Sequence, residues 1–348
     1  MHEEFSGGGI MAFTTIDDSE AYFQVKLYSG TGSEQSITLD GDTDMQPNLV
    51  WVKQRSGGEN QTIFDSNRGA PKILYPNITN AESAGTAAGE PNTLSSFDSD
   101  GFTVIADDGQ NKSGSTYVAF CWKESATAGM DLVGYTGNGS ARTISHSLSA
   151  VPHFMIVKQR SGTGNWIVYN HKNTTAPATD YFYLNTTAST ADDANAWNDT
   201  EPTSSVFSVG DGDDVNENTE TFIAHLWSEK QGFSKFDKFV GNGVVDGPFI
   251  HTGFRPAWIM IKNAEYGVDW NLHNNQSPGY NVNDNYVAPN EGAAEVTDNA
   301  SLILDICSNG FKIRGTGDAV NKGDYNICYW AFAEAPFVNS KGVPNNAR

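Results

Sequence analysis

The chain has 348 residues and a formal charge of −21, from 42 acidic and 21 basic side chains. So acidic a surface repels the phosphates of DNA and RNA, which argues against nucleic acid as a partner. Aromatic residues reach 11%, and Gly, Asn, Ser and Thr separate short apolar runs. This composition is typical of an all-β protein with many turns.

No apolar run approaches the roughly 20 residues that cross a bilayer, so we predict no membrane insertion. Residues 1–10 lack both the basic and the apolar region of a signal peptide. We therefore expect the protein to be made in the cytoplasm and not to be exported through a signal peptide. Residues 1–19 are polar and Gly-rich and are predicted to form an N-terminal tail or docking arm.

The first predicted strand covers residues 22–28, where apolar and polar side chains alternate, and it ends in a turn at Gly30 and Gly32. The next strand, residues 48–55, has apolar residues on both faces. Leu49 and Trp51 lie on one face with Lys53, and Val50 and Val52 lie on the other. We therefore predict a central strand that is covered on both sides.

The remaining elements follow from similar patterns. A hairpin loop at residues 56–60 leads to a strand at 62–65, and residues 66–96 are predicted to form a long loop. An alternating strand at 100–105 and a turn at Asn111 precede a closing aromatic strand at 117–123. About seven short strands in roughly 105 residues, with little helix, predict a β-sandwich.

The same order of segments occurs three times. Lys53, Lys158 and Lys262 are 105 and 104 residues apart. The same period separates two further sets, namely Asn111, Asn216 and Asn321, and Trp122, Trp227 and Phe332. We predict three tandem β-sandwich modules, of jelly-roll or lectin-like type, and call them repeat 1 (20–125), repeat 2 (126–230) and repeat 3 (231–338). The middle segments of the repeats (66–96, 170–204 and 274–300) differ most and are each predicted to form a long loop, and each module is expected to bury a core of its own. Residues 339–348 are predicted to form a C-terminal tail.

Two acidic clusters are candidates for metal binding. Residues Asp40-Gly-Asp-Thr-Asp44 resemble the start of a calcium loop, but Met45 and Trp51 occupy the positions where an EF-hand needs Gly and Glu. A looser calcium loop and a solvated acidic turn both remain open for this cluster and for Asp211-Gly-Asp-Asp-Val-Asn216. We predict no metal site and no cofactor.

No catalytic motif stands out. His146, His153 and His171 share repeat 2 but lack metal-ligand spacing, and no G-x-S-x-G elbow occurs. We therefore predict no catalytic residue. Two further groups receive structural interpretations: Trp51, Trp166 and Trp270 as core residues rather than sugar-stacking platforms, and Cys121, Cys307 and Cys328 as free thiols.

Several motifs together resemble a repeat found in structural proteins of tailed bacteriophages, particularly marine ones. They are Tyr135-Thr-Gly-Asn-Gly139, Pro152-His-Phe-Met-Ile-Val-Lys-Gln-Arg160, Ser99-Asp-Gly-Phe102, Gly253-Phe-Arg-Pro-Ala-Trp258 and Ala331-Phe-Ala-Glu-Ala-Pro-Phe-Val338. The resemblance covers residues 20–338 and implies a tail-fibre-like component of the virion surface with lectin-like sandwich modules. It implies no active site.

Three functions follow as expectations. The first is a non-enzymatic tail- or head-fibre-type appendage whose middle loops bind a host-surface glycan or receptor. The second is a capsid decoration protein, and the third is a virion-associated polysaccharide depolymerase. Other virion proteins of the capsid or tail are the expected partners. The tripled sequence suits either a single chain that imitates a trimer or a true homotrimer.

Overall fold

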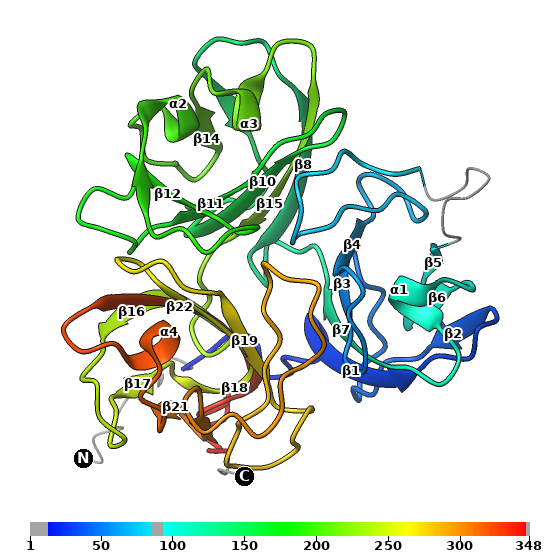
Figure 1. Ribbon diagram of the computed structural model, residues 1–348, viewed down its shortest axis with the longest axis vertical. Helices are drawn as coiled ribbons and strands as arrows, with labels where there is room; N and C mark the ends of the chain where they lie inside the picture. The colour runs from blue at the N-terminus through cyan, green and yellow to red at the C-terminus, as the bar shows by residue number, and fades with distance from the viewer. Residues whose placement is uncertain (1–12, 85–92, 346–348) are drawn as a thin grey trace, which may run out of the picture.

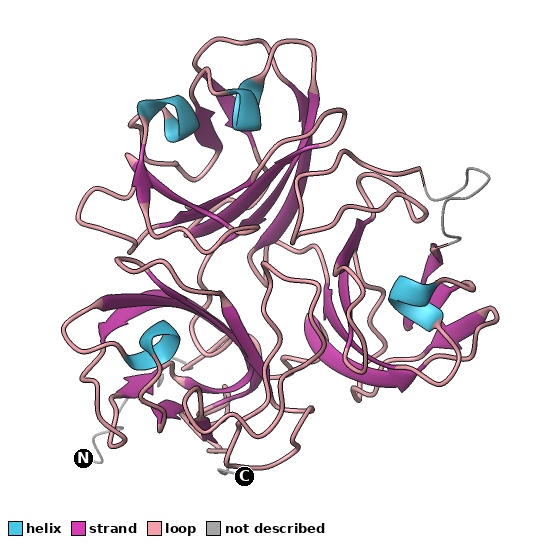
Figure 2. Cartoon of the chain, viewed as in Figure 1, coloured by secondary structure: helices cyan, strands magenta, loops and turns pink. Residues whose placement is uncertain are grey.

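The computed structural model describes residues 13–84 and 93–345. Three lobes surround a common centre, and each lobe corresponds to one repeat (Figure 1). Strands make up most of the regular structure (Figure 2). The helices in the described residues are four short segments: α1 (Asp108–Asn111), α2 (Ala194–Trp197), α3 (Asp213–Asn216) and α4 (Asp318–Asn321). The predicted all-β fold is confirmed. None of the helices in these residues has the length and hydrophobicity needed to span a bilayer.

Each repeat contains a large antiparallel sheet with the same strand pairing. Repeat 1 has the order β1-β7-β3-β4, from β1 (Phe23–Ser29), β7 (Thr116–Trp122), β3 (Leu49–Gln54) and β4 (Thr62–Asp65). Repeat 3 has the order β16-β22-β18-β19, from β16 (Ser234–Val240), β22 (Asn326–Pro336), β18 (Phe254–Asn263) and β19 (Asn271–Asn274). Repeat 2 has the order β8-β15-β10-β11, from β8 (Met130–Thr136), β15 (Thr221–Trp227), β10 (Phe154–Gln159) and β11 (Trp166–Asn170).

A smaller antiparallel sheet completes each lobe. In repeat 1 it consists of β2 (Gln35–Ile37), β6 (Gly101–Val104) and β5 (Leu94–Asp98). In repeat 2 it consists of β14 (Val206–Val209) and β9 (Arg142–Ser145). In repeat 3 it consists of β17 (Phe249–His251), β21 (Gly310–Ile313) and β20 (Leu304–Cys307). The large and small sheets of a repeat pack together through apolar side chains.

The middle segment of repeat 2 differs from the predicted long loop. It forms β12 (Asp180–Tyr183) and β13 (Ala191–Asp192), which extend the large sheet, as well as the helix α2. Phe182 is fully buried in the central core. A loop was predicted because this apolar run is short and is surrounded by Thr and Asn residues.

The two faces of β3 are buried in different cores. Val50 and Val52 pack against the small sheet of repeat 1, whereas Leu49 and Trp51 belong to a core that all three repeats share. The predicted central strand, covered on both sides, is confirmed. Repeats 1 and 2 have separate intersheet cores, but the intersheet core of repeat 3 is continuous with the shared one. Three separate cores were expected, so the shared core is a difference from the prediction.

Three aromatic rings meet at the centre of the molecule. They belong to Trp122, Trp227 and Phe332, and each ring centroid lies 5.6–6.4 Å from the other two. The register of the sheets places them there, because Trp122 pairs with Leu49, Trp227 with Phe154 and Phe332 with Trp258. Burial of these large apolar surfaces holds the three lobes together.

The recurring turn after the first strand of each repeat is fixed by two glycines and an asparagine. A Cβ atom on Gly137 would lie 2.0 Å from the carbonyl oxygen of Glu217, and Gly139 has a positive φ of 65°. Asn216 accepts the backbone N–H of Asn138 through its Oδ1 atom. Repeats 1 and 3 have the same contacts at Gly30, Gly32, Asn111, Gly241, Gly243 and Asn321. The repeated sequence motif is therefore structural.

Part of the predicted N-terminal tail contacts the body of the molecule, and the two predicted tails contact each other. Thr14 donates a hydrogen bond to the carbonyl of Gln231 at 2.8 Å, and Ile16 is buried in the shared core. The backbone N–H of Ser340 donates to the Asp17 carboxylate at 2.6 Å. Residues 1–12 of the predicted N-terminal tail and residues 346–348 of the C-terminal tail lie outside the described residues.

Candidate functional site

The three recurring lysines lie where one repeat meets another. The Lys158 ammonium of repeat 2 donates to the carbonyl of Thr79 in repeat 1 at 3.1 Å. Lys262 donates to Thr187 of repeat 2 at 2.8 Å, and Lys53 donates to Gly292 of repeat 3 at 3.1 Å. The contacts thus run from repeat 1 to 2, from 2 to 3 and from 3 back to 1. We call these contact regions junction 1–2, junction 2–3 and junction 3–1.

A buried amine is also a candidate nucleophile, so the surroundings of these lysines matter. Burial lowers the pKa of Lys158 to about 8, and it does the same for Lys53 and Lys262. All three side chains are fully buried, and backbone carbonyl oxygens accept their hydrogen bonds. This arrangement stabilises the junctions and offers no open path to a substrate.

Backbone contacts recur at all three junctions, and indole contacts recur at two of them. The N–H of Glu82 donates to the carbonyl of Arg160 at 2.7 Å; the matching pairs are Thr190 to Ala264 at 2.9 Å and Glu295 to Arg55 at 2.9 Å. Trp166 Nε1 donates to Tyr75, and Trp270 Nε1 donates to Tyr183, each across a junction. Each middle segment, expected to face a partner, therefore binds the next repeat along part of its length.

The predicted core role of the strand tryptophans is confirmed. Trp166 and Trp270 are fully buried and Trp51 is 3% exposed, so their rings cannot stack on a sugar at the surface.

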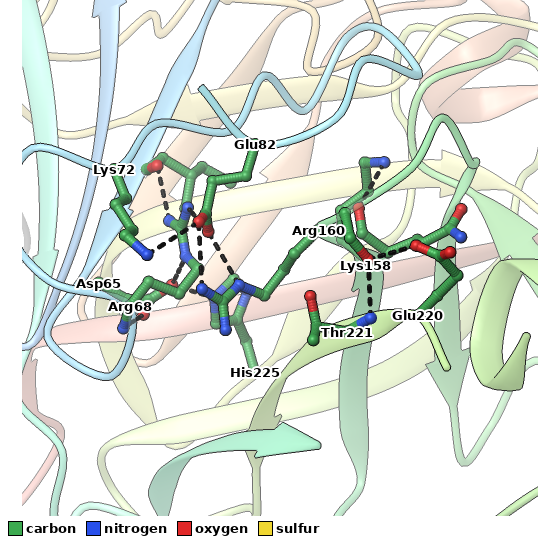
Figure 3. Close-up of polar contacts among 12 residues, drawn as sticks. Asp65, Arg68, Lys72, Glu82, Lys158, Arg160, Glu220, Thr221 and His225 are labelled. Carbon is green, nitrogen blue, oxygen red and sulfur yellow. Dashed lines mark hydrogen bonds and ion pairs between the residues drawn. The ribbon is translucent and has the colours of Figure 1, made fainter. Parts of the chain in front are cut away.

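Junction 1–2 also contains a cluster of charged side chains (Figure 3). Arg68 contacts the Asp65 carboxylate at 2.5 Å, and His225 Nε2 lies 3.1 Å from the same carboxylate. Glu82 lies between the guanidinium groups of Arg68 and Arg160, at 3.3 and 2.9 Å. Asp65, Arg68 and His225 are buried.

The electrostatics of this cluster are those of a structural ion network. Burial alone would raise the pKa of Asp65, but Arg68 and His225 beside it hold that pKa well below its usual value. Burial likewise opposes ionisation of Glu82, and its hydrogen bond from Arg160 and the charge of Arg68 outweigh it and lower the pKa. Both carboxylates are therefore ionised and paired, which leaves neither as a proton donor at neutral pH.

The two acidic clusters named from the sequence do not converge on a metal. Asp40 pairs with Lys26 at 2.5 Å, and Thr43 donates to Asp18. Asp214 accepts two hydrogen bonds from Asn165, at 2.6 and 3.0 Å. Within residues 13–84 and 93–345, no three His, Cys, Asp or Glu side chains are grouped as metal ligands would be.

The histidines of repeat 2 do meet, although not as a metal site. The rings of His153 and His171 lie 4.4 Å apart, and the Glu229 N–H donates to His153 Nδ1 at 2.9 Å. Burial lowers the pKa of His153 to about 4. His153, Glu229 and His251 line a cavity of about 420 Å³ between repeats 2 and 3.

Cys121, Cys307 and Cys328 are all free, and two of them are buried.

Two further cavities lie at equivalent places in repeats 1 and 2. The one in repeat 2 has a volume of about 450 Å³, between α2, α3 and the side chains of Tyr181 and Tyr183. Asp193, Asp211 and Asp213 are exposed around it. The one in repeat 1 has a volume of about 140 Å³ and lies beside α1, with Thr62 and Gln110 among its lining residues. These two cavities are the candidate binding sites.

Comparison with known families gives one match for the chain. A model of a domain of unknown function, DUF7483, matches residues 18–336. The chain belongs to the DUF7483 family. No curated protein and no solved structure matches it.

The sequence of this DUF7483 chain pointed to the lysines and to the Asp211–Asn216 segment, but it did not predict the residues that they contact. The partners of Lys158 and Arg160 lie in the variable middle segment of the preceding repeat. The signal in the sequence was the regular spacing of the lysines, at 105 and 104 residues. A buried polar residue that recurs at the same place in every repeat needs a recurring partner.

Proposed function

We propose that this DUF7483 chain is a non-enzymatic structural protein of a tailed bacteriophage particle, a tail- or head-fibre-type appendage that binds the host surface. The observation that carries the proposal is the set of three junctions, which link repeat 1 to 2, repeat 2 to 3 and repeat 3 back to 1 in a closed ring. One chain joins three similar lobes through equivalent buried contacts, and this gives the stiffness that a passive particle component requires. The resemblance of its motifs to phage structural repeats supports the same assignment.

The surfaces available for host binding are those that the junction contacts leave open. Part of each middle segment is used to hold the next repeat, as at Thr79, Thr187 and Gly292. The cavities beside α1 and α3 border the junctions, because the carbonyls of Tyr75 and Tyr183 accept the indole hydrogen bonds, but no described residue of another repeat lines either cavity. Weak contacts at such sites gain strength through avidity when many chains are displayed on one particle.

A capsid decoration protein is the second candidate, and the arrangement of the lobes favours it specifically. Three similar lobes around one central core present nearly the same surface three times. A chain of this shape matches a threefold position on an icosahedral shell, as a true homotrimer would. Both roles place the protein on the virion surface, with capsid or tail proteins as partners.

The test is to purify the phage particles that encode the chain and to locate it with a gold-labelled antibody by electron microscopy. Label at the tail or on head fibres, with a low copy number by quantitative mass spectrometry, is the expected result. Label spread over the shell, at a copy number near that of the capsid protein, identifies a decoration protein. Absence of the chain from purified particles overturns both assignments.

The non-enzymatic part of the proposal has its own test. Full-length protein is incubated with host capsular polysaccharide, and the viscosity is followed over time. We expect no change, because buried ionisable groups with shifted pKa values, such as Asp65 and Lys158, are enclosed by structural contacts. A falling viscosity identifies a depolymerase instead.

A further inference from the structure

The small cavity in repeat 1 is lined by polar groups that lack hydrogen-bond partners. Gln110 is fully buried, and both its Nε2 and its Oε1 atoms are without a partner. Thr62 is 1% exposed, and its Oγ1 atom is also without a partner. Both residues line the cavity. Burying a polar group without a hydrogen-bond partner is unfavourable, so these two residues call for an explanation.

Repeat 2 shows that the fold does not need polar residues here. Gln110 corresponds to Val215 in repeat 2 and to Val320 in repeat 3, and both valines are buried. Thr62 corresponds to Ile167, which lines the equivalent cavity in repeat 2, and to the buried Asn271 in repeat 3. The same backbone thus accepts apolar side chains at both positions. Repeat 1 alone combines a buried glutamine and a threonine at this place.

The cavity is large enough for more than a single water. Its volume is about 140 Å³, well above the roughly 10–15 Å³ that one water needs. Gln110 and Thr62 are both among the residues that line it. The side chain of Tyr75 contributes to the wall.

The chemistry of the lining selects the kind of ligand. Glu59, Asp107 and Asp108 contribute carboxylates, and none of the described residues that line the cavity is basic, so an anion is disfavoured. A cation would bind Gln110 Oε1 but leave the Nε2 donor unpaired. A hydroxyl group both donates and accepts, and it therefore satisfies the amide, the threonine and a carboxylate together.

We propose that this cavity binds a neutral sugar unit, held by the Gln110 amide, the Thr62 hydroxyl and the Asp107 carboxylate. Asp107 accepts the Gly109 N–H through one oxygen at 2.9 Å, and a sugar hydroxyl donates to its carboxylate as well. The proposal deepens the host-binding function and rests on it for the source of the sugar. The binding itself is independent of where the protein sits on the particle.

The experiment uses the full chain and saturation-transfer NMR with glucose, galactose, mannose and N-acetylglucosamine as probes. We expect at least one of these sugars to bind. Gln110→Val and Thr62→Ile, which introduce the residues of repeat 2, should each weaken that binding at least tenfold. Neither should lower the melting temperature, because each removes an unpaired buried polar group. Asp318→Asn, at the repeat 3 counterpart of Asp108, is the matched control and should leave binding unchanged, because Asp318 pairs with Lys322 as Asp108 pairs with Lys112 but lines no cavity described above.

Several outcomes overturn the proposal. If no sugar binds and Gln110→Val raises the melting temperature, the cavity holds water only. If calcium chloride stabilises the native chain but not Gln110→Val, the site binds a cation. If both variants bind sugar as the native chain does, the sugar lies elsewhere.

Adsorption of fluorescently labelled protein to host cells separates this inference from the proposed function. Should all variants adsorb equally to the cells, the proposed function stands and the cavity is not its site. Should sugar bind in NMR while no protein adsorbs to cells, the site stands and the host-binding function fails.

Discussion

Junctions 1–2 and 2–3 join their repeats with the same lysine and backbone contacts but with very different side-chain charge. Junction 1–2 contains the Asp65, Arg68, Glu82, Arg160 and His225 cluster. At junction 2–3 the residue matching Arg160 is Ala264, which meets Thr190 through the backbone alone. The ring therefore closes through contacts that do not depend on the ion pairs. The comparison predicts that lysine variants act alike at every junction, whereas charge variants act only locally.

The largest effect is expected from Arg68→Met at junction 1–2. Arg68 is fully buried against Asp65 and also donates to the carbonyl of Ile63 at 2.8 Å. Its loss leaves a buried carboxylate without its main partner, which should lower the free energy of unfolding by about 3–5 kcal/mol. Urea denaturation followed by tryptophan fluorescence measures this loss.

Repeat 2 supplies a matched control for that variant, because it has Asn170 and Asn173 where repeat 1 has Asp65 and Arg68. The double variant Asp65→Asn with Arg68→Asn removes both charges and should regain a measurable part of the lost stability. A double variant less stable than Arg68→Met would show that the charges themselves, rather than their pairing, hold the junction.

The next largest effect concerns the lysines. Lys158→Met and Lys262→Met should each lower the free energy of unfolding by about 2–3 kcal/mol, because buried carbonyl oxygens lose their donor. Lys112→Met, at an exposed position, serves as the control and should stay within about 0.5 kcal/mol of the native chain. Equal losses at positions 158 and 262 support equivalent junctions, and a loss at only one of them breaks the comparison.

The acid stability of repeat 3 should depend on His273. This residue is fully buried where repeats 1 and 2 have Phe64 and Tyr169, and burial lowers its pKa to about 4. In the unfolded chain the pKa is about 6.5, so between these values the unfolded state binds more protons. The free energy of unfolding should therefore fall by up to about 3 kcal/mol as the pH drops from 6.5 to 4.

His273→Phe should flatten this part of the pH profile, measured by urea denaturation across the same range. The exposed His251→Gln is the control and should keep the native slope. An unchanged slope in His273→Phe would assign the acid sensitivity to other groups.

Local patterns predicted the strands well, because the order of apolar and polar residues along a strand depends on which of its faces are buried. The strand expected at 62–65 is β4 with the same bounds, and the alternation at Leu49, Val50 and Trp51 gave the two faces of β3 correctly. The shared core was not predicted, because an apolar strand face has the same sequence pattern whether it packs within its own repeat or against another repeat. Nothing in the alternation distinguishes a face covered by a small sheet from one covered by another repeat.

The candidate sites were less predictable, since they depend on differences between aligned positions rather than on motifs. Gln110 looks ordinary in the sequence, and only its burial and its valine counterparts mark it as unusual. The partners of Lys158 lie in the segment that varies most among the repeats. Backbone carbonyls accept its hydrogen bonds there, and any residue type supplies a carbonyl.

The smallest effect tests how little the outer ion pair adds to junction 1–2. Arg160 contacts Glu82 through two nitrogens, at 2.9 and 3.1 Å, and its side chain is 19% exposed. Arg160→Ala copies Ala264 of junction 2–3 and keeps the backbone pair with Glu82. Because the pair is partly solvated, the loss should be about 1 kcal/mol, and it should shrink in high salt. A loss above 3 kcal/mol in Arg160→Ala would mean that this arginine, and not the shared lysine and backbone contacts, closes junction 1–2.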